Sequence, residues 1–349
     1  MNLIDKKYIK RCFELALKGL GATSPNPLVG SVVVYNERII GEGFHQKQGE
    51  AHAEINALNS VKERNLLPFS TLYVNLEPCS HYGKTPPCSL RIIDENIQRV
   101  VISNIDPFEK VAGSGIQMLL KAGIEVTKSV FEEEGAWLNR RFFTFHQKKR
   151  PYIILKWAQT RDGFIDIDRL HARNDASNWI TNDELKILVH KWRSEEDAIM
   201  VGSHTVVNDN PQLNVRHWCG KDPIRVVIDT EHQLTDDSYV FDGTIRTILF
   251  VDKPYQTLHP SMEQIVMPIQ DRLNFVMSAL YVREVQSILI EGGQFLLQSL
   301  IRSHLWDEAR VLTGNKNFGN GLPAPQINSL PISTKTIAGD TITTYINKN

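Results

Sequence analysis

The chain has 349 residues, of which 42% are hydrophobic and 23% are charged, and its formal net charge is −1. This length is comfortable for two domains, and the composition is that of an ordinary soluble protein. A charge near zero gives no support to binding of nucleic acid. No apolar run approaches the ~20 residues of a membrane helix, and the first residues lack the shape of a signal peptide. We therefore expect a cytoplasmic protein without nucleic-acid or membrane partners.

Strands and helices alternate along residues 1–147, which we predict to form the first domain. Residues 8–20 are amphipathic with helical spacing, and residues 29–35 are β-branched and bounded by turn residues, as in a buried strand. Further elements are predicted in chain order as a hairpin strand at 38–43, a helix at 51–61, strands at 71–74 and 99–102, and helices at 87–96 and 114–121. This alternation predicts an α/β layered domain.

The second predicted domain covers residues 148–349 and begins with a basic run, 148–150, that we expect to be a solvated linker. Thr181, with Glu184 three residues later, is expected to cap a helix that runs to about Trp192. Strands are predicted at residues 152–157, 198–201, 225–228, 247–250 and 287–290, and a helix at 294–301. These elements favour a nucleotide-binding α/β domain whose chemistry the residues themselves leave open.

Four cysteines in a chain of this length do not form a disulfide scaffold, and paired cysteines in a reducing compartment are typical of metal sites. His52, Cys79 and Cys88 supply the nitrogen and sulfur ligands that zinc prefers, and three ligands leave a fourth position for water. Zinc lowers the pKa of such a water. Glu54, two residues after His52, is suited to transferring the protons of a hydrolytic deamination. We therefore expect Glu54 to be the catalytic acid and base.

Other interpretations of these residues stay open at this point. The cysteines could be buried apolar residues, or the zinc could be structural, although structural sites usually have four protein ligands. The usual second pair is Cys-x-x-Cys, whereas eight residues separate Cys79 from Cys88 here. That longer loop could hold a substrate phosphate through Lys84, or it could be a surface insertion. Glu291-Gly292-Gly293 suits an anionic ligand at a helix start, and equally an ordinary turn.

Three segments of the first domain form a specific combination: Pro25-Asn26-Pro27-x-Val29-Gly30, His52-Ala53-Glu54 and the run from Glu77-Pro78-Cys79 through Lys84 to Pro87-Cys88. Together they closely resemble the RibD family of riboflavin biosynthesis proteins. The resemblance implies a cytidine deaminase-like α/β/α domain followed by a dihydrofolate reductase-like α/β domain. It also implies zinc-dependent deamination of 2,5-diamino-6-ribosylamino-4(3H)-pyrimidinone 5′-phosphate, and then NADPH-dependent reduction of the ribosyl group to ribityl. The implied cofactors are one Zn²⁺ and NADPH.

The same resemblance implies binding residues in both domains. In the first domain it places substrate contacts at Asn26, His45, His81, Lys84, Asn104 and Asp106. In the second it places NADPH contacts at Ala158, Trp179, Thr205, Asp209 and Gly293, and substrate contacts at Ser177, Arg193, Leu213, Arg216 and Glu291. Arginine is well suited to this role because its guanidinium matches phosphate oxygens. Lys156 and Asp209 are candidate polarising groups, and a structural lysine–carboxylate pair is the rival interpretation.

The second half departs from the family pattern in one segment. Residues 163–178 are longer than expected, and Asp175-Ala176 replaces the glycine that usually precedes Ser177. The stretch after Gly319 is too divergent for any residue to be assigned. Two rival functions remain: a monofunctional nucleoside or RNA-base zinc deaminase with an appended non-catalytic binding domain, and a binding module with structural zinc. A homo-oligomer is the expected assembly, since most oligomers are of this kind.

Overall fold

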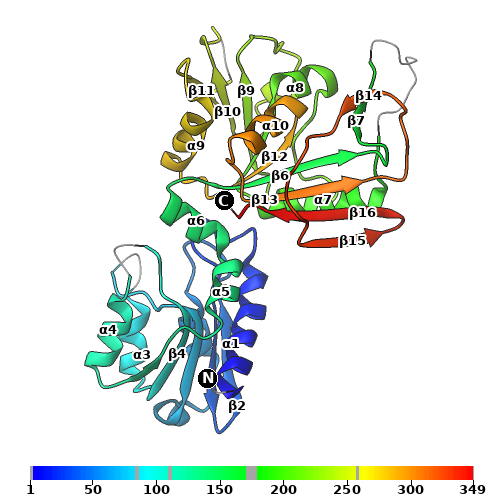
Figure 1. The fold of residues 1–349 in the computed structure, drawn as a ribbon. Coiled ribbons are helices and arrows are strands. Elements are labelled where there is room, and N and C mark those ends of the chain that lie inside the picture. Colours follow the sequence, from blue (N-terminus) through cyan, green and yellow to red (C-terminus); the bar gives the residue numbers. More distant parts are fainter. Residues whose placement is uncertain (1–2, 83–85, 109–111, 170–178, 257–258, 349) are drawn as a thin grey trace. The chain divides into compact units, whose positions relative to one another are not determined.

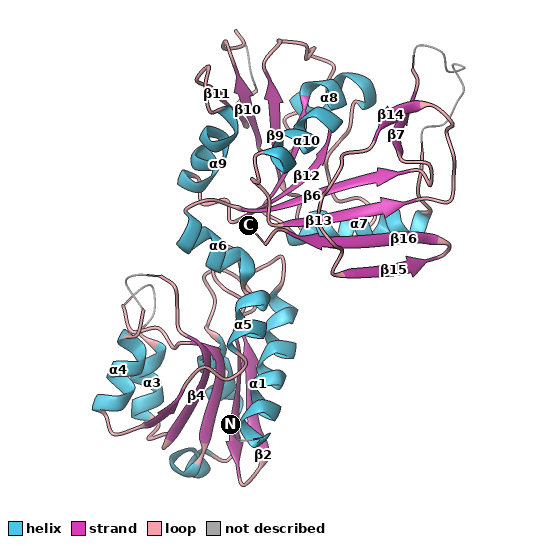
Figure 2. Ribbon diagram, in the orientation of Figure 1, coloured by secondary structure: helices cyan, strands magenta, loops and turns pink. Residues whose placement is uncertain are grey.

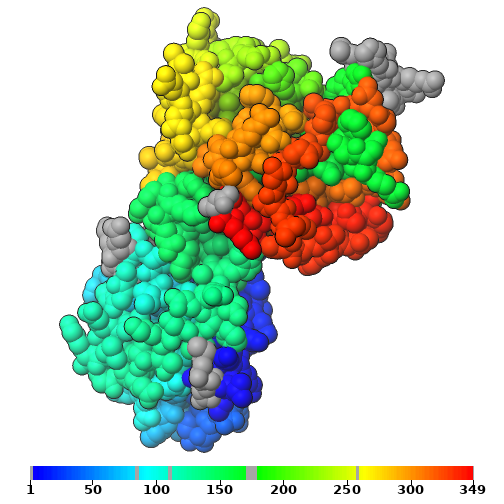
Figure 3. All heavy atoms as spheres, viewed as in Figure 1, coloured from blue at the N-terminus to red at the C-terminus, as the bar shows by residue number. Residues whose placement is uncertain are grey.

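The computed structural model describes residues 3–82, 86–108, 112–169, 179–256 and 259–348 (Figure 1). Contacts divide the chain into two units, Met1–Lys149 and Arg150–Asn349. Each unit consists of one continuous stretch of sequence (Figure 3). The division falls two residues after the boundary expected between 147 and 148. The basic run 148–150 spans this division, and Lys148 and Lys149 are exposed, as expected of a solvated linker. Lys148 also ends helix α6 (Arg140–Lys148), and Arg150 pairs with buried Asp307 at 2.8 Å.

The first unit is built on a five-stranded sheet with the order β2-β1-β3-β4-β5. β1 pairs antiparallel with both of its neighbours, whereas β3, β4 and β5 are parallel. The carboxyl ends of β3 and β4 therefore lie at the same edge of the sheet. The strands are β1 (Gly30–Tyr35), β2 (Arg38–Phe44), β3 (Thr71–Leu76), β4 (Arg99–Asn104) and β5 (Glu125–Thr127).

Helices cover both faces of this sheet (Figure 2). Apolar side chains of α2, α3 and α4 pack on one face in a cluster that includes Leu58, Ile92 and Leu119. The other face packs against α1 through Tyr8, Ile9 and other residues. The predicted α/β/α layering is confirmed. The helices are α1 (Leu3–Ala16), α2 (Ala53–Ser60), α3 (Cys88–Asp94), α4 (Ser114–Lys121) and α5 (Glu132–Leu138), followed by α6.

The second unit contains a nine-stranded sheet with the order β11-β10-β9-β8-β12-β6-β13-β16-β15. Its strands from β11 to β13 are parallel, and β16 pairs antiparallel with both β13 and β15. A small separate sheet pairs β7 (Phe164–Ile167) with β14 (Gly321–Pro323). The strands of the large sheet are β6 (Tyr152–Gln159), β8 (Ala198–Gly202), β9 (Ile224–Asp229), β10 (Thr247–Val251), β11 (Met262–Val266), β12 (Ser287–Gly292), β13 (Glu308–Thr313), β15 (Ser333–Ile337) and β16 (Asp340–Ile346).

Helices α9 (Arg272–Val282) and α10 (Gln294–Arg302) pack on one face of the large sheet, and α7 (Asp183–Glu195) and α8 (Ser203–Asp209) on the other. The expected cap at Thr181 is wrong by one residue. Asn182 caps α7, because its Oδ1 accepts the N–H of Leu185 at 2.8 Å. Among the described residues, no helix is both long and apolar enough to cross a membrane.

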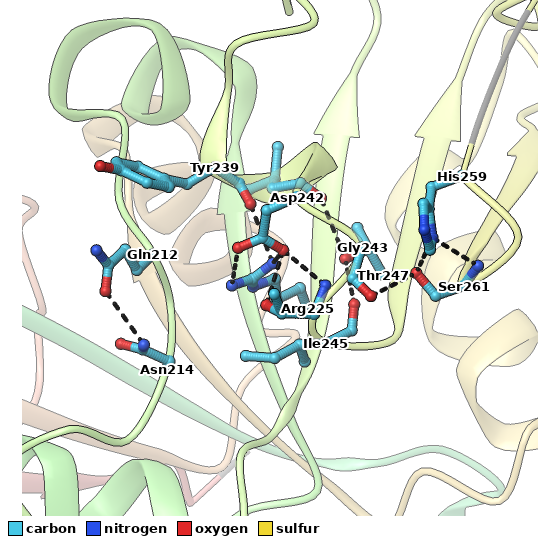
Figure 4. Close-up of polar contacts among 12 residues, drawn as sticks. Gln212, Asn214, Arg225, Tyr239, Asp242, Gly243, Ile245, Thr247, His259 and Ser261 are labelled. Carbon is cyan, nitrogen blue, oxygen red and sulfur yellow. Dashed lines mark hydrogen bonds and ion pairs between the residues drawn. The ribbon is translucent and has the colours of Figure 1, made fainter.

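One ion pair between a buried arginine and an aspartate nearer the surface fixes the segment that follows β9 (Figure 4). Arg225 is 1% exposed, and its Nη1 donates to Asp242 Oδ1 at 2.7 Å and to the carbonyl of Tyr239 at 3.0 Å. Removing one partner of such a pair leaves the other charge buried and unpaired, which is costly. The hydrogen bond from Arg225 lowers the pKa of Asp242 from 3.8 to about 2.

Replacing Asp242 with Asn is expected to lower the free energy of unfolding at pH 7 by ~1.5–3 kcal/mol. A carboxyl whose pKa is depressed by folding stabilises the protein fully above its ordinary pKa, and this stabilisation is lost as the pH falls through the folded value. The difference between wild type and Asp242→Asn should therefore shrink as the pH falls from about 4 to about 2. Urea titrations across this range measure it, with exposed Asp236→Asn as control. A difference independent of pH would contradict the assigned pair.

Candidate active sites

Three metal-ligating side chains converge at the edge of the first sheet. His52 immediately precedes α2, Cys79 follows β3, and Cys88 is the first residue of α3. His52 Nδ1 lies 3.6 Å from Cys79 Sγ and 3.3 Å from Cys88 Sγ, and the three ligand atoms are all within 4.8 Å of one another. A tetrahedral zinc site with bonds of ~2.0–2.3 Å has edges of roughly 3.3–3.8 Å. The donor set therefore fits zinc, with one position left over.

Electrostatic interactions favour a thiolate in this group. A hydrogen bond from Cys88, together with His52, lowers the pKa of the Cys79 thiol to about 4. The backbone N–H of Cys88 also donates to Cys79 Sγ at 3.3 Å. Since zinc binds the thiolate rather than the thiol, these contacts prepare Cys79 as a ligand.

Glu54 lies in the first turn of α2 and is 3% exposed. Burial raises the pKa of its carboxyl to about 7. A carboxyl with this pKa can both take and return a proton near neutral pH, which is what a general acid and base must do. The structure thus places beside the three ligands a carboxyl suited to proton transfer.

Asn26 and His45 form a chain of contacts that ends at the metal ligands. Asn26 Nδ2 lies 3.0 Å from His45 Nε2, and His45 Nδ1 lies 3.1 Å from the carbonyl of Ala51. The edge of the His45 ring meets the ring of His52, with 5.4 Å between centroids. A histidine that donates from Nδ1 to a carbonyl accepts at Nε2, and so Asn26 Nδ2 is the donor. The amide oxygen of Asn26 then stays available to a substrate.

The loop between the two cysteines is described only in part. His81 is exposed, and Ser80 Oγ lies 2.5 Å from Ser114 Oγ at the start of α4. Lys84, the expected phosphate contact, lies outside the described residues. Its role stays a prediction.

Glu77 is a buried carboxylate that the sequence analysis did not single out. It accepts the backbone N–H groups of Asp106 at 3.3 Å, Gly113 at 2.9 Å and Ile116 at 3.1 Å. Glu77 therefore ties the segment after β4 and the start of α4 to the segment that carries Cys79. Its place before Pro78-Cys79 was visible in the sequence, but its partners are 29 to 39 residues away.

The two substrate contacts expected near the end of β4, Asn104 and Asp106, differ in their surroundings. Burial raises the pKa of Asp106 to about 6, and its Oδ1 accepts the N–H of Phe108 at 2.8 Å. Asn104 is 3% exposed, and its amide donates to the carbonyl of Glu132 at 2.9 Å and accepts from Ser103 Oγ. These contacts favour a structural role for Asn104, and its contact with substrate stays a prediction.

The second unit contains a cavity of about 1230 Å³. It opens at the carboxyl ends of β6, β8, β9 and β12, where ligands of parallel α/β sheets usually bind. Ser177 lies outside the described residues. Every other residue expected in this half lines the cavity: Ala158, Trp179, Thr205, Asp209 and Gly293 for NADPH, and Arg193, Leu213, Arg216 and Glu291 for substrate.

A buried ionic cluster occupies one wall of this cavity. Arg193 grips Glu291 with two hydrogen bonds, Nε to Oε1 at 2.7 Å and Nη2 to Oε2 at 2.8 Å, and Lys156 Nζ lies 3.4 Å from Oε2. Burial alone would raise the pKa of Glu291, but the charges of Arg193 and Lys156 hold it well below its usual range. Burial also lowers the pKa of Lys156. The cluster thus combines a carboxylate held in one orientation, that of Glu291, with an ammonium group, that of Lys156, that gives up its proton more readily than an exposed lysine.

The residues expected to contact NADPH lie around the ends of two helices. Thr205 is in α8, and its Oγ1 lies against Gly292 and Gly293, so that a Cβ built on Gly293 would be only 3.2 Å away. Asp209 ends α8 and pairs with Arg169 at 2.6 Å. Trp179 is half exposed and carries Lys186 Nζ over its ring at 4.7 Å. At the two glycines a ligand can come close to the backbone, and Lys186 supplies a positive charge nearby. Both features suit an anionic dinucleotide.

Two family models match the chain. The model of the cytidine and deoxycytidylate deaminase zinc-binding region covers residues 3–104, and that of the RibD C-terminal domain covers residues 151–341. The riboflavin biosynthesis protein RibD of Aquifex aeolicus is 39% identical over 324 residues, which cover 91% of this chain and 89% of that protein. RibD of Escherichia coli is 34% identical over 348 residues, with coverage of 90% and 89%.

Solved structures agree over the full length. A diaminohydroxyphosphoribosylaminopyrimidine deaminase/5-amino-6-(5-phosphoribosylamino)uracil reductase from Thermotoga maritima matches with a TM-score of 0.88 and 35% identity over 99% of both chains. RibD of Acinetobacter baumannii matches with a TM-score of 0.88 and 29% identity, again over 99% of both chains. With both units, their order and the two sites accounted for, the chain belongs to the RibD family of riboflavin biosynthesis proteins.

Proposed function

We propose that the two activities of this RibD-family chain, a deaminase and a reductase, are divided between its two units. The first removes the 2-amino group of 2,5-diamino-6-ribosylamino-4(3H)-pyrimidinone 5′-phosphate as ammonia. The second reduces the ribosyl group of the deaminated product to ribityl. The observation that supports this most strongly is the convergence of His52, Cys79 and Cys88 beside buried Glu54, in a chain whose other unit matches the RibD C-terminal domain.

In the first unit, His52, Cys79 and Cys88 hold zinc, which when bound lowers the pKa of a water and so supplies the nucleophile. Glu54 takes a proton from the attacking water and delivers one to the leaving amino group. Asn26 presents its amide oxygen to the pyrimidine, because its Nδ2 is held by His45. His81 and Lys84 face the phosphate, and Asn104 and Asp106 contribute a second polar edge.

In the second unit, NADPH supplies a hydride to C1′ of the ring-opened ribose when it is bound. Ala158, Trp179, Thr205, Asp209 and Gly293 hold the cofactor in the cavity. Lys156 polarises the reacting group, since burial weakens its hold on its proton. The substrate is held by Ser177, Arg193, Leu213, Arg216 and Glu291, among which the two guanidinium groups suit phosphate oxygens.

The assembly and the compartment belong to the same proposal. We expect a homo-oligomer located in the cytoplasm, without nucleic-acid or membrane partners. All four cysteines are free thiols, as is usual for a reducing compartment.

A coupled assay tests both activities in the intact, zinc-loaded chain. With the diamino substrate and NADPH together, we expect ammonia release followed by loss of NADPH absorbance at 1:1 stoichiometry. With NADPH and the diamino substrate after zinc has been removed by a chelator, both signals should disappear, whereas deaminated substrate should still consume NADPH. Absence of NADPH oxidation with the deaminated substrate would leave a monofunctional deaminase and contradict the proposed second activity.

A further inference from the structure

His190 is a buried histidine in the reductase cavity to which the proposed function gives no role. It lies on α7, three residues before Arg193, so the two side chains share one face of the helix. His190 is 2% exposed and lines the cavity together with Arg193, Arg216 and Glu291. A buried polar side chain in this position calls for a function or a structural partner.

The contacts of His190 define its protonation state. Its Nδ1 accepts the backbone N–H of Arg216 at 3.2 Å, and its ring meets the ring of His217 edge-on with 4.7 Å between centroids. Because Nδ1 is an acceptor, the proton of the neutral ring is on Nε2. Burial, together with the nearby Arg193 and Arg216, lowers the pKa of His190 to about 4. The side chain is therefore neutral at pH 7.

The segment that carries Arg216 is fastened to α7 at two points. His190 holds the N–H of Arg216, and Arg193 Nη1 donates to the carbonyl of Asn214 at 3.1 Å. Within the segment, Asn214 Nδ2 donates to Gln212 Oε1 at 3.1 Å (Figure 4), and Arg216 Nη1 donates to Asn214 Oδ1 at 2.8 Å. These bonds orient the guanidinium of Arg216 relative to α7.

Cations outnumber anions around this segment. Lys156, Arg193 and Arg216 lie around it with two carboxylates, those of Glu291 and of Asp222, whose Oδ1 accepts the N–H of Val215 at 2.6 Å. His190 is neutral. Burial, together with the charge of Arg193, lowers the pKa of Arg216, whereas the charge of Glu291 raises it. An anionic group such as a phosphate monoester would offset this excess of positive charge.

We propose that His190 is a positioning residue for recognition of the substrate's 5′-phosphate in the reductase, acting by holding the backbone of Arg216. This inference rests on the proposed function, in which Arg216 contacts the substrate. The neutral acceptor Nδ1 holds the backbone N–H of Arg216 in place, and the Arg216 side chain then reaches the phosphate. Among the described residues Nε2 has no hydrogen-bond partner, so that the neutral ring also offers one N–H donor.

The test compares His190→Phe with His190→Asn in the full chain, using the deaminated substrate with and without its 5′-phosphate. Phe keeps the ring shape but removes the acceptor, whereas the Asn amide oxygen replaces Nδ1. For the phosphorylated substrate, His190→Phe should raise KM about tenfold with little change in kcat, as expected for lost uniform binding. His190→Asn should restore most of the affinity. The unphosphorylated substrate should show less than a twofold change with either variant.

Three controls separate positioning from general damage. His217→Ala removes the ring contact but not the Nδ1 bond, so KM should stay within about twofold. Turnover of the unphosphorylated substrate reports on correct folding of the second unit, since this substrate uses the same cavity without the phosphate contact. In an Arg216→Ala background, His190→Phe should add little, because the two residues act through one contact.

Equal effects of His190→Phe on both substrates, or full additivity with Arg216→Ala, would overturn the inference. Arg216→Ala itself should weaken only the phosphorylated substrate. If it does so while His190→Phe has no effect, the inference about His190 is wrong and the proposed function stands. If Arg216→Ala leaves both substrates unchanged, the assigned role of Arg216 fails, and the inference about His190 fails with it.

Discussion

Replacing Glu54 with Gln is expected to slow ammonia release by ~10²–10⁴-fold, the range that general acid–base catalysis contributes. Gln has nearly the same shape but can neither take a proton from water nor deliver one to the leaving amino group. Because Glu54 is not one of the three ligand side chains, the zinc content should remain close to one per chain. The reductase should consume NADPH normally when deaminated substrate is supplied.

Ammonia release from the diamino substrate measures this effect, together with metal analysis of the same sample. Exposed Glu50, four residues earlier in the chain, provides the matched control as Glu50→Gln, which should deaminate at the wild-type rate. Full ammonia release by Glu54→Gln would show that another group transfers the protons. A loss of zinc in this variant would instead show that Glu54 supports the metal ligands.

Replacing Cys79 with Ser should remove the zinc and the deaminase activity together. A serine hydroxyl stays protonated at pH 7 and is a far poorer zinc ligand than a thiolate. Loss of an outer hydrogen-bond partner of a ligand already costs ~10–100-fold in metal affinity, and loss of the ligand itself should cost more. His52 and Cys88 would then be the only ligands left in the group.

The matched control is Cys219→Ser, which removes an exposed thiol of the other unit. It should keep both zinc and ammonia release. Reductase activity of Cys79→Ser with deaminated substrate should be unchanged, because the cavity belongs to the second unit. Zinc retained at one per chain in Cys79→Ser, with ammonia release intact, would rule out Cys79 as a ligand.

Much of the first unit could be predicted because its signals are local. The helix at 114–121 was predicted with the bounds that the structure has, and the strands at 71–74 and 99–102 are each only two residues longer in the structure. Apolar periodicity and flanking turn residues are enough for such elements. The basic run 148–150 marks the join between the units, but it does not reveal that α6 extends to Lys148 or that Arg150 pairs with the distant Asp307.

The end of the chain was harder to predict. β13, β15 and β16 were not predicted from the sequence, and β16 mixes threonines with apolar residues, without the uniform run of a buried strand. Its pairing with β13 is antiparallel at the end of an otherwise parallel sheet. Such pairing depends on contacts between distant segments, and propensity within a short window does not report it.

The residues of the two sites likewise differ in how well the sequence predicts them. The three expected zinc ligands and Glu54 belong to short sequence motifs, so their roles could be predicted from the sequence alone. The three backbone groups bound by Glu77, and the bond from Arg216 to His190, join residues 26 to 39 positions apart, and no local pattern indicates them. The cap of α7 was misplaced because Thr181 and Asn182 are both good caps, and the amide of Asn182 is held in place by the carbonyl of Ile337, 155 residues away.

The arrangement of the metal ligands has a consequence for the stability of the first unit. His52 and Cys88 stand at the starts of two helices, and Cys79 follows a central strand that pairs with both β1 and β4. The three side chains are brought together by elements that are distant in the sequence, so the complete set of ligands exists only in the folded unit. The free energy of zinc binding therefore adds to the stability of the folded state, and removing the metal should make the first unit easier to unfold.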